Sequence, residues 1–401
     1  MSDERPVQML VLASYFKGER FMQQAHARGA RVWLLTVERL LGKPWPRGSL
    51  VDVFAQGDES TREQTIRTVS YLARSLRFDR IVALDDFDVE TAAALREHLR
   101  LPGMGDTTAR YFRDKLAMRV RARDEGIPVP DFVHVLNHDA LREFMKRVPA
   151  PWMFKPRGEA SATGIIKIET EEQLWRTLDG KGDDQSFYLL ERYLPGDVFH
   201  VDSVVADYEV VFQECHRCGK PPFNVAHGGG IFTTSTVERG SADEQELVGL
   251  NMAVLETFGL RRGVSHVEFI KSREDGKFYF LEGAARVGGA HIADVVEASS
   301  GLNLWQEWAN LEVDDEQRPY HPPKVYEDYA GVAITLARQE HPDLSGYNDP
   351  EIVLRPAEEH HAGLVIRSKD HARVQSLLES YQERFLQDFC ASLPAPARSA
   401  H

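Results

Sequence analysis

The segment HVEFIKSREDGKFYFLEGAARVGG, His266 to Gly289, contains two apolar runs that flank a polar turn. The turn, Ser272 to Gly276, carries an Asp-Gly pair, which is typical of a tight β-hairpin. Alternation of side chains along each strand predicts two faces. The first face is expected to hold Glu268, Ile270, Phe278, Phe280 and Glu282. The second is expected to hold Val267, Phe269, Tyr279 and Leu281.

This hairpin carries two acids on one predicted face, Glu268 and Glu282. Neighbouring carboxylates repel one another unless a cation lies between them, and Mg²⁺ commonly binds one or two carboxylates plus substrate phosphates. The two acids are therefore candidate metal ligands. The alternative is a surface hairpin whose acids are simply solvated. Arg286 and the pair Gly288-Gly289 follow, and a fixed guanidinium beside a metal suits an anionic substrate.

Length and charge limit the classes of protein that this chain can represent. A chain of 401 residues predicts two to four subdomains. The net charge of -14 argues against nucleic acid or an anionic membrane as the main partner. Three cysteines are too few for a disulfide framework. We expect a cytoplasmic protein, since neither a signal peptide nor a membrane-spanning apolar run is recognisable.

The first hundred residues alternate between predicted strands and helices. Strands are expected at residues 7–13, 32–36 and 80–84, and helices at 61–77 and 89–99. This alternation predicts a parallel, Rossmann-like α/β layer. The first strand is not followed by Gly-x-Gly-x-x-Gly, which argues against NAD binding. The acids of Asp85-Asp86-Phe87-Asp88 either cap the next helix or contact substrate, and the cap is the favoured interpretation.

Two lysines and a loop of small residues follow in the next part of the chain. Lys115 lies on a basic helix, and Lys155 lies on a strand at 152–156. The loop 157–164 contains Gly158, Ser161 and Gly164, and a strand resumes after it. A loop of this kind can fold over phosphates through its backbone N–H groups, with the lysine supplying charge. It lacks the Walker sequence, and the alternative is a plain hairpin loop.

The stretch from Tyr188 to Asp197 combines an apolar strand, an acid and a short linker. The backbone at Arg192 to Leu194 could meet the polar edge of adenine, and a carboxylate could hold ribose hydroxyls. The alternative is an ordinary strand end with a Pro-Gly turn. A hairpin is expected next, with strands at 199–205 and 209–212 and its turn at Asp207-Tyr208.

The remaining features are less specific. Cys215 and Cys218 form one C-x-x-C, and without a second ligand pair a zinc site is unsupported. The loop 219–235, which contains His227, either faces substrate or only connects strands. Helices are expected at 243–258, 292–298, 304–311 and 371–389, with strands near 331–336 and 363–366.

Five elements in order resemble the ATP-grasp superfamily over about residues 1–310. They are Lys115, Lys155 with its small-residue loop, Glu191-x-x-Leu194-x-Gly196-Asp197, Glu268, and Glu282-x-x-x-Arg286. The resemblance is greatest to the carboxylate–amine ligases that include L-amino-acid ligases and biotin-carboxylase-like enzymes. It implies an α/β and α+β ATP-grasp fold with an N-terminal Rossmann-like domain, two ATP-gripping lobes and a C-terminal α+β cap. The implied boundaries are 1–105, 106–190, 191–312 and 313–393, followed by a disordered tail at 394–401.

The resemblance also implies a role for each motif residue. ATP would be held by Lys115, Lys155, Gly158, Ser161, Gly164, Glu191, Arg192, Leu194 and Asp197, with Glu191 to Leu194 at the adenine edge and Asp197 at the ribose. Glu268 and Glu282 would bind Mg²⁺ (or Mn²⁺). Arg286, together with Glu282, would act in catalysis by steadying the substrate carboxylate and the acyl-phosphate. Many members have Asn two residues after the second metal glutamate, whereas this chain has Ala284, which leaves open whether one or two metals bind.

The chemistry implied is ATP-dependent joining of a small carboxylate, an amino acid among the candidates, to an amine. Attack of the carboxylate on the γ-phosphate gives an acyl-phosphate and ADP, and the amine then displaces phosphate. His266 or His227 could assist as a base, although a structural histidine is the favoured interpretation at both positions. The alternatives are a carboxylase or acid–thiol ligase of the same fold, or a nucleotide-binding regulatory protein without turnover. A homodimer is possible in each case.

Overall fold

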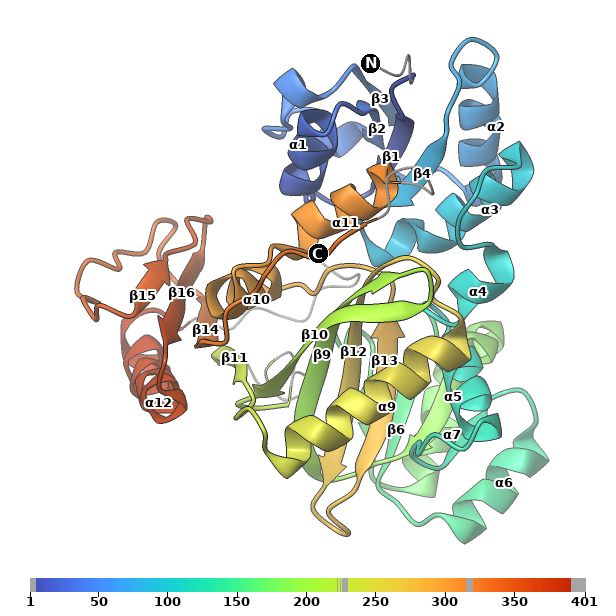
Figure 1. Ribbon diagram of the computed structural model, residues 1–401. Coiled ribbons are helices and arrows are strands. Elements are labelled where there is room, and N and C mark those ends of the chain that lie inside the picture. Colours follow the sequence, from blue (N-terminus) through green and yellow to red (C-terminus); the bar gives the residue numbers. More distant parts are fainter. Residues whose placement is uncertain (1–4, 222, 224, 226–229, 315–319, 391–401) are drawn as a thin grey trace.

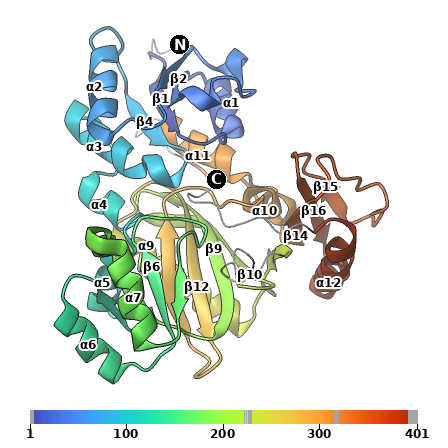
Figure 2. The ribbon, with the colours of Figure 1, turned by 180° about the vertical axis from the view of Figure 1, so that it is seen from behind.

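The computed structural model describes residues 5–221, 223, 225, 230–314 and 320–390. The predicted disordered tail and His227 lie outside these residues. Within them, the strands form two four-stranded sheets and one eight-stranded sheet. Figure 1 shows the N-terminal sheet above the eight-stranded sheet, with the C-terminal strands and their helix at one side. Seen from behind in Figure 2, helices α6 and α7 lie on the outside of the small lobe.

The N-terminal domain is the predicted Rossmann-like layer. Its parallel sheet has the order β3-β2-β1-β4, and α2 begins with a capping box between Thr61 and Gln64. The strands are β1 (Gln8–Ala13), β2 (Arg31–Val37), β3 (Asp52–Gln56) and β4 (Arg80–Ala83). The helices are α1 (Glu19–Ala27), α2 (Arg62–Leu72), α3 (Val89–Leu99) and α4 (Asp106–Arg110), with 3-10 turns η1 (Glu38–Leu40), η2 (Arg47–Ser49) and η3 (Asp86–Asp88).

Strand β1 explains why this layer needs helices on both faces. All six of its residues are buried. Met9 and Val11 pack into a core with α1 and α11 (Leu304–Val313), whereas Leu10 and Leu12 pack into a second core with α2 and α3. Helix α11 comes from far along the chain, so it joins the N-terminal domain to the rest of the molecule (Figure 1).

The small lobe is an antiparallel sheet of order β5-β8-β6-β7, covered by two helices. Its elements are β5 (Phe132–His134), α6 (His138–Arg147), β6 (Trp152–Pro156), β7 (Ile166–Ile168), α7 (Glu171–Lys181), η4 (Gly182–Phe187) and β8 (Tyr188–Arg192). Strands β6 and β7 pair across the small-residue loop, which confirms the predicted strand–loop–strand unit. Asn137 and Thr170 cap α6 and α7 with their side chains.

The large sheet has the order β13-β12-β9-β10-β11-β14-β16-β15, and each of its pairs is antiparallel. Its strands are β9 (Gly196–Ala206), β10 (Glu209–Cys218), β11 (Phe232–Thr236), β12 (Gly263–Ser272), β13 (Phe278–Ala284), β14 (Tyr329–Leu336), β15 (Ile352–Leu354) and β16 (His361–Ser368). Its remaining helices are α5 (Lys115–Asp124), α9 (Ala242–Phe258), α10 (Ile292–Ser300) and α12 (His371–Asp388). Because β11 pairs with β14, this sheet continues across the predicted boundary at 312/313.

The focal hairpin forms as β12 and β13, but half of its predicted face assignment is wrong. Glu268 pairs directly with Glu282, whereas Phe269 pairs with Phe280, so Leu281 is an extra residue in a β-bulge. A bulge exchanges the faces of the residues that follow it. Phe278 and Phe280 therefore join Val267 and Phe269 in one core, while Tyr279 and Leu281 join Ile270 on the other face.

Candidate active site

The two predicted metal ligands face each other across the hairpin. Glu268 and Glu282 are cross-strand partners, with side chains 22% and 29% exposed. Lys115 Nζ lies 2.6 Å from Oε2 of Glu282, and His266 Nε2 lies 3.4 Å from Oε1 of Glu268. Burial acts to raise the pKa of Glu282, but Lys115 and Lys155 together lower it. Glu282 is therefore held ionised, and both carboxylates are partly open, as metal ligands require.

Lys115 connects this pair to the small-residue loop. It is the first residue of α5, whose N-cap Asp114 accepts hydrogen bonds from the backbone of Leu116 and Ala117. Its Nζ donates to the carbonyl of Glu159 at 2.6 Å, and its backbone N–H donates to the carbonyl of Arg157 at 2.9 Å. One lysine thus touches both the loop and a predicted metal ligand.

The loop itself adopts an unusual backbone. Ser161, Ala162 and Gly164 have positive φ values of 54°, 58° and 70°. Arg113 donates to the carbonyl of Gly158, and Arg157 pairs with Asp114. Successive backbone N–H groups in a turn that contains left-handed residues can form a concave site for anions such as phosphate oxygens.

Lys155 and Arg119 both form ion pairs with Glu191, a residue of β8 in the small lobe. Lys155 Nζ lies 2.6 Å from Oε1 of Glu191, and Arg119 Nε lies 2.7 Å from Oε2. Glu191 is 1% exposed. Burial acts to raise the pKa of Glu191, but Arg119 and Lys155 lower it. Both carboxylate oxygens are thus occupied, so this acid fixes Lys155 in place.

An apolar patch lies on the same sheet face as the glutamates. Leu194, Val198, Cys218 and Ile270 form it, with Phe232, Tyr279 and Leu281 packed beside them. An apolar cluster of this kind suits the face of an adenine ring. A Cβ on Gly196 would lie 2.4 Å from the carbonyl of Lys271, which explains the glycine at this motif position.

Two predicted nucleotide residues lie at the outer end of this patch. Asp197 forms ion pairs with Arg217 and Arg273, and Arg192 pairs with Glu274. Burial acts to raise the pKa of Asp197, but its hydrogen bonds and ion pairs with Arg273 and Arg217 together lower it. Among the described residues, no contact links Arg192 or Asp197 to the glutamate pair. The sequence-predicted residues therefore divide into an inner group around Glu268 and Glu282 and an outer group around Arg192 and Asp197.

Arg286 links the hairpin to the N-terminal domain. Its Nε and Nη2 lie 2.8 and 2.7 Å from Oδ2 of Asp86, and its Nη1 donates to the carbonyl of Val287. The neighbouring Asp85 caps η3 by accepting from Phe87 and Asp88. Asp85 therefore caps the short η3 turn that precedes α3, and Asp86 contacts Arg286 of the candidate site. Contact of this acidic cluster with substrate stays a prediction.

A buried polar band beside Glu268 was not predicted from the sequence. It comprises His200 and Asp202 of β9, Glu214 and His216 of β10, and His266 of β12. Asp202 accepts from His200 at 2.7 Å and from His266 at 2.9 Å. The signal in the sequence is the alternation of ionisable residues along FHVDS and ECHRC, where a buried strand should be apolar.

This band holds paired charges. Burial lowers the pKa of His200 to about 4. Burial also opposes charge on His216 and His266, but neighbouring carboxylates, Asp202 foremost, raise the pKa of each to about 9. Ligand atoms of His200, Asp202 and His266 lie within 4.8 Å of one another, and their hydrogen bonds account for this closeness. Because both ring nitrogens of His266 face carboxylates, its geometry favours a structural role.

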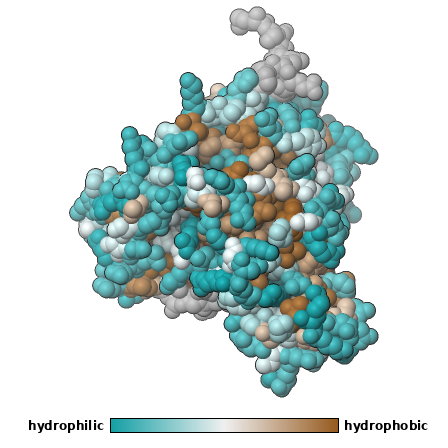
Figure 3. Space-filling view, turned by 60° about the horizontal axis from the view of Figure 1, so that its bottom comes forward, coloured by the Kyte–Doolittle hydropathy of each residue, from teal (hydrophilic) through white to brown (hydrophobic). Residues whose placement is uncertain are grey.

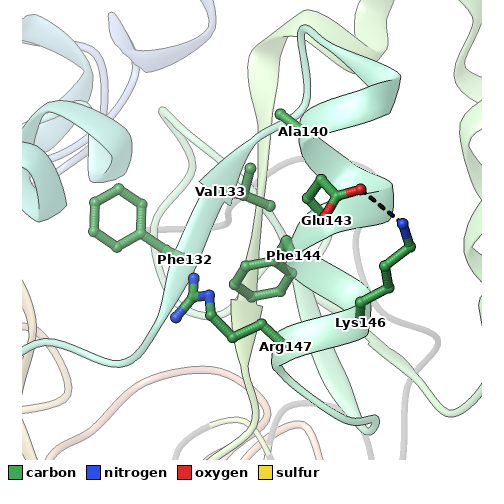
Figure 4. Close-up of a pocket in the computed structure, with 7 residues that line it drawn as sticks. All are labelled: Phe132, Val133, Ala140, Glu143, Phe144, Lys146 and Arg147. Carbon is green, nitrogen blue, oxygen red and sulfur yellow. Dashed lines mark hydrogen bonds and ion pairs between the residues drawn. The ribbon is translucent and has the colours of Figure 1, made fainter.

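A second concavity lies on the small lobe and shares no lining residue with the candidate site. Figure 4 shows Phe132 and Val133 of β5 facing Phe144 and Arg147 of α6, with Glu143 paired to Lys146. It has a volume of about 590 Å³. The space-filling view in Figure 3 shows one face of the whole molecule, which is mostly hydrophilic at its edges and has apolar residues gathered toward its centre. Among the described residues, the charged motif residues gather around Glu268 and Glu282 and not at this concavity.

This architecture is the ATP-grasp fold, as the resemblance implied. The structure of L-amino acid ligase from Bacillus licheniformis superposes with a TM-score of 0.76 at 16% identity, over 98% of this chain and 100% of that one. Carboxyaminoimidazole ribonucleotide synthase from Aspergillus clavatus, complexed with ATP, gives 0.72 at 15% identity, covering 94% and 99%. No family model matches the chain.

Two curated relatives confirm the resemblance to carboxylate–amine ligases. The L-arginine-specific L-amino acid ligase of Bacillus subtilis is 28% identical over 243 residues, which are 59% of this chain and 58% of that protein. A D-alanine–D-alanine ligase of Actinobacillus succinogenes is 27% identical over 125 residues, or 29% and 41%. These matches span less than two thirds of either relative. Among the described residues, no helix has the length and apolar character needed to cross a bilayer.

Proposed function

We propose that this protein is an ATP-dependent carboxylate–amine ligase that makes a dipeptide-like amide through an acyl-phosphate, releasing ADP and phosphate. The observation that carries this proposal is the pairing of Glu268 with Glu282, with Lys115 at 2.6 Å and Arg286 four residues further on. The names of the relatives, an L-amino acid ligase and D-alanine–D-alanine ligases, support amino acids as the substrate class.

The nucleotide would lie between the small lobe and the large sheet. Adenine would rest on the patch around Leu194 and Ile270, and the phosphates would extend toward Lys115 and Lys155. Fixing Lys155 through buried Glu191 orients its ammonium before ATP binds, so less side-chain entropy is lost on binding. The loop at 157–164 would cover the phosphates with its N–H groups.

The residues present fit a hard divalent cation. Glu268 and Glu282 offer two facing carboxylates with few competing partners, which is the ligand type that Mg²⁺ prefers. When bound, Mg²⁺ (or Mn²⁺) would offset the negative charge of the phosphates during transfer. Ala284 pairs with His266 across the hairpin. Neither side chain is a carboxamide, whereas many members of the superfamily have Asn at the position of Ala284. We therefore expect one protein-held metal position here.

Arg286 is the residue placed to hold the acid substrate. A guanidinium carries five N–H donors, and three of those of Arg286 serve Asp86 and Val287. The two others remain for a carboxylate or an acyl-phosphate oxygen. Anchoring by Asp86 would keep the guanidinium plane fixed while charge moves on the substrate, which is how preorganised donors stabilise a transition state.

Amide formation then needs a dry site. The acyl-phosphate is lost to hydrolysis if water reaches it before the amine does. Closure of the small-residue loop onto Lys115 would exclude water, because that lysine already bonds the loop carbonyl of Glu159.

The test is phosphate release measured across a matrix of amino acids supplied singly and in pairs, with ATP and Mg²⁺. The proposal expects release only with particular pairs, and a dipeptide by mass spectrometry in equal amount. The variant Glu282→Gln should lower the rate at least a hundredfold. Release with bicarbonate alone would favour the carboxylase alternative, and ATP binding without turnover on any pair would favour the regulatory alternative.

A further inference from the structure

Another cavity, the junction cavity, lies between the N-terminal domain and the large sheet. It has a volume of about 550 Å³. Its walls come from the edge strand β4, helix α3, the β9–β10 turn, the segment between α9 and β12, and helix α11. Its described lining residues include none of the predicted nucleotide, metal or catalytic residues. The cavity is therefore separate from the candidate active site.

This junction cavity concentrates positive charge in an acidic protein. Four arginines and two carboxylates line it, which gives the lining a net charge of +2, whereas the whole chain carries -14. The arginines are Arg80, Arg96, Arg261 and Arg262, and the acids are Asp207 and Glu312. Part of the remaining wall is apolar, including Val82, Met104 and Val264. A net positive lining in such a chain favours a ligand that carries an anionic group.

Glu312 lies among these arginines without a direct ion pair to any of them, as far as the described residues show. Its Oε1 accepts from the indole N–H of Trp308 at 3.2 Å. Burial raises its pKa, although Arg80, Arg96 and Arg262 act in the opposite direction. Opposite charges that face one cavity without touching leave room for a bridging molecule.

Two of the arginines still offer N–H groups. Arg96, which is 8% exposed, donates from Nε to the carbonyl of Met104 and from Nη1 to that of Ile81. Its Nη2 has no hydrogen-bond partner among the described residues. Arg262 donates from Nη1 to the carbonyl of Asp314, and its Nη2 lies 3.7 Å from Oδ2 of Asp207, while its buried Nε has no hydrogen-bond partner among the described residues. A buried donor such as Nε of Arg262 is costly unless a ligand or water satisfies it.

We propose that the junction cavity binds a zwitterion of amino-acid or dipeptide size, with its carboxylate at Arg96 and Arg262 and its ammonium at Glu312. A phosphorylated ligand would bring two or more negative charges toward Glu312, whereas a zwitterion satisfies both signs of the lining. The apolar wall around Val82 and Met104 would take the ligand's side chain. This inference does not rest on ligase activity, because the cavity shares no lining residue with that site.

Trp308 provides a local probe of occupancy. The chain has six tryptophans, and labelling with 5-fluorotryptophan would give six ¹⁹F resonances, with that of Trp308 assigned through Trp308→Phe. The probes are the twenty L-amino acids and their glycyl dipeptides, with acetate and methylammonium as single-charge controls. We expect a saturable shift of the Trp308 resonance for a subset of the zwitterions, and at least tenfold weaker binding of both controls.

Two variants decide the assignment. Glu312→Gln and Arg262→Gln should each weaken the zwitterion at least tenfold, whereas Arg77→Gln, an exposed arginine outside the cavity, should leave its affinity unchanged. Arg96 is left intact because it holds two backbone carbonyls. The proposal is overturned if no probe shifts the Trp308 resonance, if acetate binds as well as the zwitterions, or if both cavity variants bind normally. A zwitterion that binds this cavity in a protein without ligase activity would uphold this inference and refute the proposed function.

Discussion

Glu191 and Glu282 are both strand-borne glutamates that contact a lysine, yet their surroundings differ. Glu191 is 1% exposed, and its two oxygens contact Lys155 and Arg119. Glu282 is 29% exposed, has one lysine partner, and faces a second carboxylate in Glu268. The first carboxylate has no free oxygen for a ligand, whereas the second has a free oxygen and an acidic neighbour that repels it.

This difference separates two uses of the same residue type. A buried acid with two cations holds the framework, because removing it leaves uncompensated charges in a dry environment. A partly exposed carboxylate beside another carboxylate is repelled by it, and a bound cation relieves this repulsion. The comparison therefore predicts that Glu191 governs stability, whereas Glu268 and Glu282 govern metal binding.

The largest effect should follow from Glu191→Gln. This change keeps the shape of the side chain but leaves Lys155 and Arg119 without a counter-charge, which should cost about 3–5 kcal/mol in the local opening of the small lobe. Hydrogen exchange followed by mass spectrometry on peptides covering β6 and β8 would measure it.

The matched control is Glu282→Gln. Lys115 keeps the carbonyl of Glu159 as a partner, and the repulsion with Glu268 disappears. We therefore expect exchange protection within about 1 kcal/mol of the wild type, as for a half-exposed pair. Equal losses in both variants would remove the distinction between the two glutamates.

A smaller effect is expected from Glu268→Gln on the metal requirement of nucleotide binding. Loss of one carboxylate should weaken Mg²⁺ at the site, so the Mg²⁺ concentration needed for half-maximal binding of a non-hydrolysable ATP analogue should rise about tenfold, or ~1.4 kcal/mol. Calorimetric titration at several Mg²⁺ concentrations measures it. Nucleotide affinity without Mg²⁺ should stay unchanged or improve, and a fall there would indicate that Glu268 contacts ATP directly.

Much of this comparison could be predicted from sequence because its elements are local. The hairpin of Glu268 and Glu282 follows from an Asp-Gly turn between two apolar runs, and the two acids do face each other. The pairing of Glu191 with Arg119 joins residues 72 apart, so no local pattern reveals it. The resemblance to the superfamily placed Glu191 at the adenine edge, and that role stays a prediction.

Two other features depend on register and long-range pairing. The bulge at Leu281 changes which aromatic residues face the core, and strict alternation cannot detect one inserted residue. The polar band forms because β9, β10 and β12 align Asp202 with His266 and Glu214. Strand order and register are set by the whole sheet, so the sequence shows the alternation in each strand but not the cluster that results.

The smallest predicted effect concerns an ion pair that is more exposed than either glutamate site. His291, just before α10, contacts Asp294 at 2.8 Å and Glu358 at 3.3 Å, and Glu358 is 56% exposed. Burial opposes charge on His291, but these two carboxylates raise its pKa to about 9. The stabilisation is therefore complete below the ordinary pKa of about 6.5 and is lost as the pH rises through about 9.

Solvent screening limits this contribution to about 0.5 kcal/mol. Thermal unfolding of the wild type should show a slightly lower Tm at pH 10 than at pH 7, and His291→Gln should remove that part of the decrease. Glu358→Gln should reduce it by about half, since Asp294 still contacts the ring. A pH dependence that is identical in the wild type and in His291→Gln would show that this histidine is not charged in the folded protein. The comparison would then hold only for buried carboxylates.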